Sequence, residues 1–193
     1  AIEQLHKYLD LPGANYLKGI RDIAQDHIDP NYLAREQSIR NVQKLGALGI
    51  TYDLLTKTPE LPAAIEMVKA CPDVQFVMDH ISKPYISKQE MQPWKKLISE
   101  LASFPNVVCK ISGLVTEANW NNWQVKDFLP YTDHLLEIFT PARLMFGSDW
   151  PVATLAASYS EVVELAESLT AGLSISEGES FWSQTAIHAY NLG

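Results

Sequence analysis

Five short apolar runs alternate along the chain with longer segments of helical periodicity, and this alternation limits the possible folds more than any other feature. The runs lie about 30 residues apart, which is the size of one strand–helix–strand unit. No tight-turn signal joins two of them, so hairpins are not expected. The sequence therefore predicts an α/β fold with a parallel sheet. The predicted strands are Tyr16–Asp22, Ile50–Leu54, Val74–His80, Asn106–Ser112 and Leu144–Ser148.

The predicted helices lie between and after these strands. Each carries apolar residues three or four positions apart, and several begin at a proline or end near a glycine or proline. The last two follow the fifth strand, and one more precedes the first strand. The expected helices are Ala1–Leu9, a segment starting at Asp29-Pro30, one starting at Thr58-Pro59, one containing Trp94–Leu101, then Val125–Phe139, Tyr159–Leu169 and Glu177–Tyr190.

Two architectures repeat this unit, the (β/α)8 TIM-type barrel and the doubly wound sheet. No Gly-x-Gly-x-x-Gly turn and no Gly-rich phosphate loop follows any strand, which disfavours the nucleotide-binding folds. A complete barrel needs about 250 residues, whereas this chain has 193. We therefore expect residues 1–193 to form a single domain, a partial barrel with the last five of eight units and without the three N-terminal ones.

Composition excludes several classes of partner. The chain is 47% apolar and 20% charged, and its net charge of −8 disfavours nucleic acid and anionic membranes. No apolar stretch approaches the roughly 20 residues of a membrane span. Cys71 and Cys109 are too far apart for a short metal motif, and we expect them to be buried, reduced thiols of a cytoplasmic protein. The remaining expectation is a small-molecule substrate, with oligomerisation left open.

Asp149 is the strongest candidate for chemistry, because it follows a buried strand in the run Leu144–Pro151. The carboxyl ends of parallel strands are where α/β barrels place their active sites. A carboxylate there can take a proton from water or bind a metal that holds the water. The alternative is that Asp149 caps the following loop or helix. Polar residues also end the other four strands, so we favour the catalytic reading.

His80 ends the third predicted strand. Strand alternation predicts that it shares a face with Phe76 and Met78, while Asp79 points the other way as a structural group. A neutral imidazole at this place can bind a metal or polarise a carbonyl, and its alternative role is that of a hydrogen-bonded structural histidine.

Four further residues are predicted to bind substrate. Arg21 and Lys110 are cations on otherwise apolar strands, so each must meet a carboxylate or a substrate anion. Tyr52 and Asp53 are neighbours, and which of the two faces inward is left open. Trp150 is expected to line a pocket. The predicted substrate-binding set is Arg21, Lys110, Tyr52 and Trp150. The remaining histidines are expected at the surface: His6, His27, His134 and His188.

The strand ends resemble the amidohydrolase superfamily, in particular its sugar lactonases of the L-fuconolactonase and L-rhamnonolactonase types. The resemblance implies a (β/α)8 barrel in which these strands are the fourth to eighth. It also implies hydrolysis of a lactone by activated water, with Asp149 as base, His80 as ligand or electrophile, and Arg21 meeting the substrate. The matching segments are Gly19–Asp22, Tyr52–Leu55, Phe76–Pro84, Val108–Leu114 and Leu144–Pro151.

The resemblance further implies a divalent metal such as zinc, held by His80 and Asp149. The family normally completes that site with a His-x-His pair on its first strand, and this chain contains no such pair. Zinc requires about three protein ligands, and some family members work without a metal, so the expected cofactor is either zinc or none. Two alternative functions stay open: a decarboxylase or other lyase on the same barrel, and a non-catalytic partial barrel that acts as a binding or scaffold protein.

Overall fold

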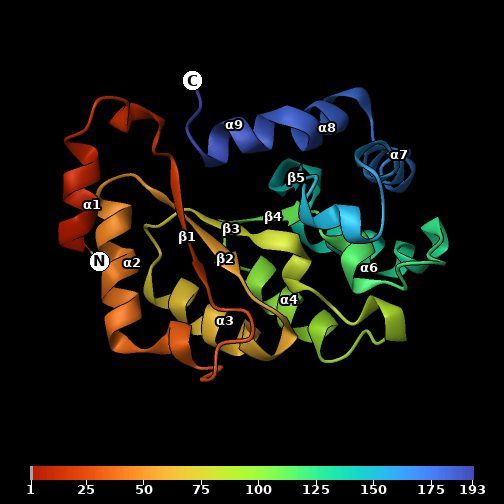
Figure 1. The fold of residues 1–193 in the computed structure, drawn as a ribbon, viewed down its shortest axis with the longest axis horizontal. Helices are drawn as coiled ribbons and strands as arrows, with labels where there is room; N and C mark the ends of the chain where they lie inside the picture. The colour runs from red at the N-terminus through yellow and green to blue at the C-terminus, as the bar shows by residue number, and fades with distance from the viewer. Residues whose placement is uncertain (1) are drawn as a thin grey trace.

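The computed structural model describes residues 2–193, and its strands form one five-stranded sheet in the order β1-β2-β3-β4-β5 (Figure 1). Every neighbouring pair is parallel. The carboxyl ends of all the strands therefore lie at one edge of the sheet, and the predicted parallel α/β fold is confirmed. The strands are β1 Gly19–Ile23, β2 Thr51–Leu55, β3 Phe76–Met78, β4 Val107–Ile111 and β5 Leu144–Phe146.

Helices cover both faces of this sheet, with α3 and α4 on one side and α8 and α9 on the other (Figure 1). A π-helical turn at Ser180–Gln184 joins α8 to α9, so that the last predicted helix is continuous. None of the helices described between residues 2 and 193 is long and apolar enough to cross a membrane. The helices are α1 Ile2–Leu9, α2 Glu36–Ala47, α3 Leu61–Ala70, α4 Trp94–Ala102, α5 Leu114–Glu117, α6 Leu129–Phe139, α7 Tyr159–Leu169, α8 Ile175–Glu179 and α9 Thr185–Ala189.

Two predicted boundaries are wrong for local reasons. The helix expected from Asp29 begins only at Glu36, because the Asp29 carboxylate accepts hydrogen bonds from the Asn31 amide at 2.9 Å and from Arg35 Nε at 2.8 Å. A side chain that bonds the backbone two residues ahead stabilises a turn in place of a helix. The third strand ends at Met78, before its predicted end at His80, because the chain turns sharply at Asp79.

The sheet has two unlike faces. Its outer face packs on the helices in a large apolar core, which includes the fully buried Phe76 and Trp94. Its inner face has only a small apolar cluster, in which Val77, Val108 and Met145 contact Ala189 of α9. The inner face therefore has room for polar side chains, and these lie toward the carboxyl edge.

The histidines correct one prediction. His134 was expected at the surface but is 8% exposed, because it lies on the face of α6 that packs against α4. Its Nε2 atom is 2.9 Å from Ser99 Oγ. His27 is half-buried and stacks on Tyr32, whereas His188 is exposed. The side chain of His6 lies outside the described residues.

Arg143 holds the start of β5 against the neighbouring elements. Its guanidinium donates four hydrogen bonds, to the carbonyl oxygens of Ala102 at 2.9 Å, Phe104 at 3.1 Å, Val107 at 3.2 Å and Ile138 at 3.2 Å. These carbonyls end α4, lead into β4 and lie near the end of α6. The single cation therefore joins three elements around β5.

We expect Arg143→Leu to lower the free energy of unfolding by about 2–3 kcal/mol, because hydrogen bonds from a charged group are lost and carbonyl oxygens stay unpaired. Urea denaturation gives the value. Arg40→Leu is the matched control, since Arg40 makes only an exposed pair with Glu36 at 3.2 Å and such pairs contribute about 0–1 kcal/mol. Equal losses in the two variants would contradict the proposed role of Arg143.

Burial of His134 also predicts a pH dependence of stability. Burial lowers the pKa of this imidazole below its usual value of 6.5. The unfolded chain therefore takes up a proton below about pH 6.5 that folded His134 resists, so stability should fall as the pH drops through that value. Urea midpoints at pH 7.5 and 5.5 should differ less in His134→Gln than in the wild type. His188→Gln, a control at an exposed position, should keep the wild-type difference between the two urea midpoints. A wild-type difference in His134→Gln would refute the proposed effect of His134 on stability.

Candidate active site

Asp149 and His80 meet at the carboxyl edge of the sheet. His80 Nε2 lies 3.4 Å from Asp149 Oδ1, and each side chain is only 9% exposed. The other carboxylate oxygen, Oδ2, is buried and has no hydrogen-bond partner among the described residues. A buried carboxylate oxygen without a donor is costly. This atom is therefore suited to a water molecule, a cation or a substrate hydroxyl.

A left-handed turn places His80 at this point. His80, Ile81, Ser82 and Lys83 have φ values of 52°, 48°, 58° and 45°, a conformation that costs non-glycine residues energy. Ile81 O accepts from Trp94 Nε1 at 2.7 Å, and Ser82 Oγ lies 2.7 Å from Thr56 Oγ1. The prediction that His80 shares a face with Phe76 and Met78 is wrong, because strand alternation stops at Met78.

Ser112 and Gly113, which follow β4, fix the imidazole ring. His80 Nδ1 lies 2.8 Å from Ser112 Oγ. A Cβ atom on Gly113, whose φ is 62°, would lie 2.9 Å from His80 Cβ. Burial lowers the pKa of His80, with an opposing effect from Asp149. The ring is thus held in place, with Nε2 directed at the Asp149 carboxylate.

Asp79 lies immediately beside this pair and is fully buried. Its Oδ2 atom accepts from Arg21 Nη1 at 3.0 Å, and its Oδ1 atom accepts from Lys110 Nζ at 2.6 Å. Burial opposes its ionisation, but Lys110 and His80 together hold the pKa of Asp79 below its usual range. Both predicted cations, Arg21 and Lys110, therefore find a carboxylate of this chain.

Asp53 and Tyr190 complete the polar group on the inner face. Tyr190 OH donates to Asp53 at 2.7–2.8 Å and accepts from Lys110 Nζ at 3.1 Å. Lys110 Nζ also lies 3.5 Å from Asp53 Oδ2. Burial raises the pKa of both Asp53 and Tyr190. The sequence gives no sign of this role for Tyr190, because the residue ends the last predicted helix and no strand-end signal marks it.

The question of Tyr52 or Asp53 is settled by the register of β2. Asp53 faces inward, whereas Tyr52 is 4% exposed and packs edge-on against Phe76 in the outer core. The substrate-binding role predicted for Tyr52 does not fit this placement, because its side chain is buried in the outer core. Trp150 lies next to the site but is 65% exposed.

Lys83, which follows β3, and Glu117, which follows β4, form a second ion pair. The sequence pattern did not indicate this pair. Lys83 Nζ lies 3.9 Å from Glu117 Oε1, and the two side chains are 12% and 21% exposed. Burial raises the pKa of Glu117. Lys83 lies in the matching segment Phe76–Pro84, but no pattern assigns it a role. Glu117 lies on the short helix α5, which the sequence pattern did not predict.

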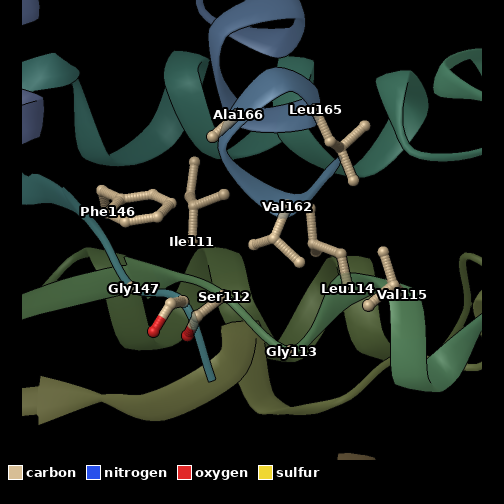
Figure 2. A pocket seen from close by; sticks show the side chains of 11 residues that line it. Ile111, Ser112, Gly113, Leu114, Val115, Phe146, Gly147, Val162, Leu165 and Ala166 are labelled. Atoms are coloured by element: carbon tan, nitrogen blue, oxygen red, sulfur yellow. The ribbon is translucent and has the colours of Figure 1, made fainter. Parts of the chain in front are cut away.

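An apolar hollow lies behind Ser112, between the ends of β4 and β5 and helix α7 (Figure 2). Val162, Leu165 and Ala166 of α7 face Ile111 and Phe146 across it (Figure 2). Ser112 and Ser148 supply its only side-chain hydroxyls. The hollow therefore backs the Asp149–His80 pair with apolar side chains and offers no chemistry of its own.

The site contains two strong donors for a metal. Among the side chains that the structure describes, no group of three or more from His, Cys, Asp or Glu is arranged to hold a metal ion. His80 Nε2 and the unpartnered Asp149 Oδ2 match ligand types that zinc accepts, but zinc usually takes about three protein ligands. The pair fits a zinc ion only if further ligands come from beyond these residues.

Known proteins resemble the chain over nearly its whole length. The family model described as Amidohydrolase matches residues 4–192. An L-fucono-1,5-lactonase from Burkholderia multivorans is 37% identical over 188 residues, which cover 91% of this chain and 63% of that protein. The chain thus spans less than two thirds of that relative.

Solved structures agree with this assignment. The structure of an amidohydrolase from Burkholderia multivorans with bound zinc is 35% identical, with a TM-score of 0.93, and the match covers 99% of this chain and 70% of that one. A 2,6-dihydroxybenzoate decarboxylase from Rhizobium has 11% identity and a TM-score of 0.64, covering 100% and 67% of the two chains, and so shares the fold alone. The predicted partial barrel and the resemblance are confirmed: the chain belongs to the amidohydrolase family.

Proposed function

We propose that the protein is a hydrolase that opens a sugar-type lactone by attack of an activated water, with Asp149 and His80 as its catalytic residues. The observation that carries this proposal is the buried Oδ2 atom of Asp149, which has no hydrogen-bond partner in the described part of the chain, on a carboxylate whose Oδ1 atom lies 3.4 Å from His80 Nε2. A general base needs a free lone pair within reach of the water that it deprotonates. The lactonase name of the Burkholderia multivorans relative supports the substrate class.

The proposed reaction uses Asp149 for proton transfer and Arg21 for the oxyanion. Asp149 Oδ2 takes a proton from water as the water oxygen bonds to the lactone carbonyl carbon. The ring C–O bond then breaks, and the proton passes to the departing ring oxygen, which yields a hydroxy acid. Arg21 can stabilise the oxyanion, because its side chain is 48% exposed and only its Nη1 atom is bonded to Asp79.

Other residues of the site are given supporting roles in this proposal. Trp150 covers one side of the substrate, and the Lys83–Glu117 pair binds its hydroxyls. Lys110 acts indirectly, since its ammonium group is already shared by Asp53, Asp79 and Tyr190. The substrate-binding role predicted for Lys110 therefore becomes one of holding other side chains.

We further propose that His80 and Asp149 hold a zinc ion together with ligands from outside residues 2–193. The bound zinc of the related Burkholderia multivorans structure supports this. A divalent ion supplies Lewis acidity, which makes water easier to deprotonate and polarises a carbonyl.

We also propose a cytoplasmic location, since Cys71 and Cys109 are both free thiols and oxidising compartments favour disulfides.

Asp149→Asn should lower kcat for an aldonolactone by about 100- to 10,000-fold, the usual contribution of general acid–base catalysis. The reason is that the amide cannot accept the proton. A pH-stat assay on L-fucono-1,5-lactone measures the rate, and Asp133→Asn, an exposed change on α6, controls for the substitution. Turnover that survives in Asp149→Asn would remove this carboxylate from the mechanism.

Removal of the metal provides a separate test. After dialysis against a chelator, the purified protein should lose lactone hydrolysis and regain it with added Zn²⁺, and His80→Gln should bind Zn²⁺ more weakly in a chelator-competition assay. Full activity in a metal-free preparation would refute the zinc proposal. Release of CO₂ from an aromatic acid, with no lactone opened, would favour the lyase alternative, and neither activity would favour a binding protein.

A further inference from the structure

We propose that five residues of the inner face act together as a brace that positions His80, and that the brace makes the C-terminal helix part of the active site. The brace consists of Arg21, Asp53, Asp79, Lys110 and Tyr190. Asp53, Asp79, Lys110 and Tyr190 are positioning residues, while Arg21 also meets the oxyanion as proposed above. The proposal deepens the hydrolase function proposed above and rests on it for its kinetic part. Among the side chains that the structure describes, His80 contacts Ser112 and Asp149 and none of these five, so the effect passes through the backbone.

The first step is the fixing of Asp79. Its carboxylate is fully buried and uses both oxygens, one on Arg21 from β1 and one on Lys110 from β4. A buried carboxylate cannot leave two such partners without a large loss of free energy. The side chain of Asp79 is therefore fixed between strands on either side of β3.

The second step is the turn that follows. Asp79 precedes the left-handed residues His80, Ile81, Ser82 and Lys83. This conformation persists only where surrounding contacts determine it. Trp94 and Thr56 bind the far part of the turn, through Ile81 O and Ser82 Oγ. Asp79 fixes its beginning, and the orientation of the His80 ring depends on both ends.

The third step connects Lys110 to the C-terminal helix. Lys110 Nζ donates to Tyr190 OH at 3.1 Å, and the Tyr190 hydroxyl donates to Asp53. A Cβ atom on Gly147 would lie 2.9 Å from Lys110 Cγ, so this glycine leaves room for the lysine. The hydroxyl of Tyr190 therefore sets the position of the cation that holds Asp79.

The helix itself is held independently of this hydroxyl. Thr51 Oγ1 donates to Ala189 O at 2.5 Å, and Ala189 packs on Val77, Val108 and Met145. Removing only the Tyr190 hydroxyl should thus leave α9 in place and remove one of the three contacts that position Lys110 Nζ. Loss of this hydroxyl therefore tests the position of His80 without unfolding the C-terminal helix.

Tyr190→Phe is the test, with Tyr131→Phe as its control. Tyr131 is buried and loses one hydroxyl hydrogen bond, to Glu90 O at 3.4 Å, on the far side of the sheet. The imidazole ¹⁵N and ¹H resonances of His80, assigned by their loss in His80→Gln, report the ring directly. We expect these resonances to shift in Tyr190→Phe and in Asp79→Asn, and to stay in place in Tyr131→Phe. We expect kcat for lactone hydrolysis to fall about tenfold in Tyr190→Phe with KM little changed.

Two results would overturn the brace: His80 resonances that do not move in Tyr190→Phe, or resonances that move equally in Tyr131→Phe. A wild-type protein that opens no lactone would refute the proposed function instead, and the resonance test of the brace would still be decided. A tenfold loss of kcat in Tyr190→Phe without any change at His80 would also count against the brace.

Discussion

The structure depends on the burial of one carboxylate, that of Asp79, between two cations. Moving an ion out of water costs several kcal/mol even in a relaxed protein, and the cost is recovered only with close partners. Arg21 and Lys110 supply these partners at 3.0 and 2.6 Å. The two cations come from β1 and β4, so the ion group ties the strand register of most of the sheet to the geometry of its carboxyl edge.

This arrangement explains why the inner face has so little apolar packing. The outer face contributes to a large core, whereas the inner face combines a small apolar cluster with charged side chains. Electrostatic interactions between these charged groups are stronger in low-dielectric surroundings than in water. Such interactions can both stabilise charge in a reaction and hold side chains in position. The same sheet thus provides stability on one side and chemistry on the other. Asp149 and His80 lie at the carboxyl edge of the sheet.

Much of this was predictable from sequence, because apolar runs and strand ends follow simple periodicities. The parallel sheet, the helix Tyr159–Leu169 and the meeting of His80 with Asp149 all follow from the strand–helix repeat. Contacts that depend on the three-dimensional path were missed. Tyr190 reaches Asp53 from 137 positions away in the chain, and no local pattern reports such a contact. The orientation of His80 was missed because strand alternation does not continue into a turn.

In the proposed mechanism, Asp149 and His80 direct a carboxylate oxygen and a ring nitrogen at one point, where the reacting water binds. A crystal structure of the protein with Zn²⁺ and a sugar acid, the expected product, tests this most directly. We expect the ion and the carboxylate of the acid to lie between Asp149 Oδ2 and His80 Nε2. An ion and a product bound elsewhere, with Asp149 Oδ2 bonded only to protein, would contradict it.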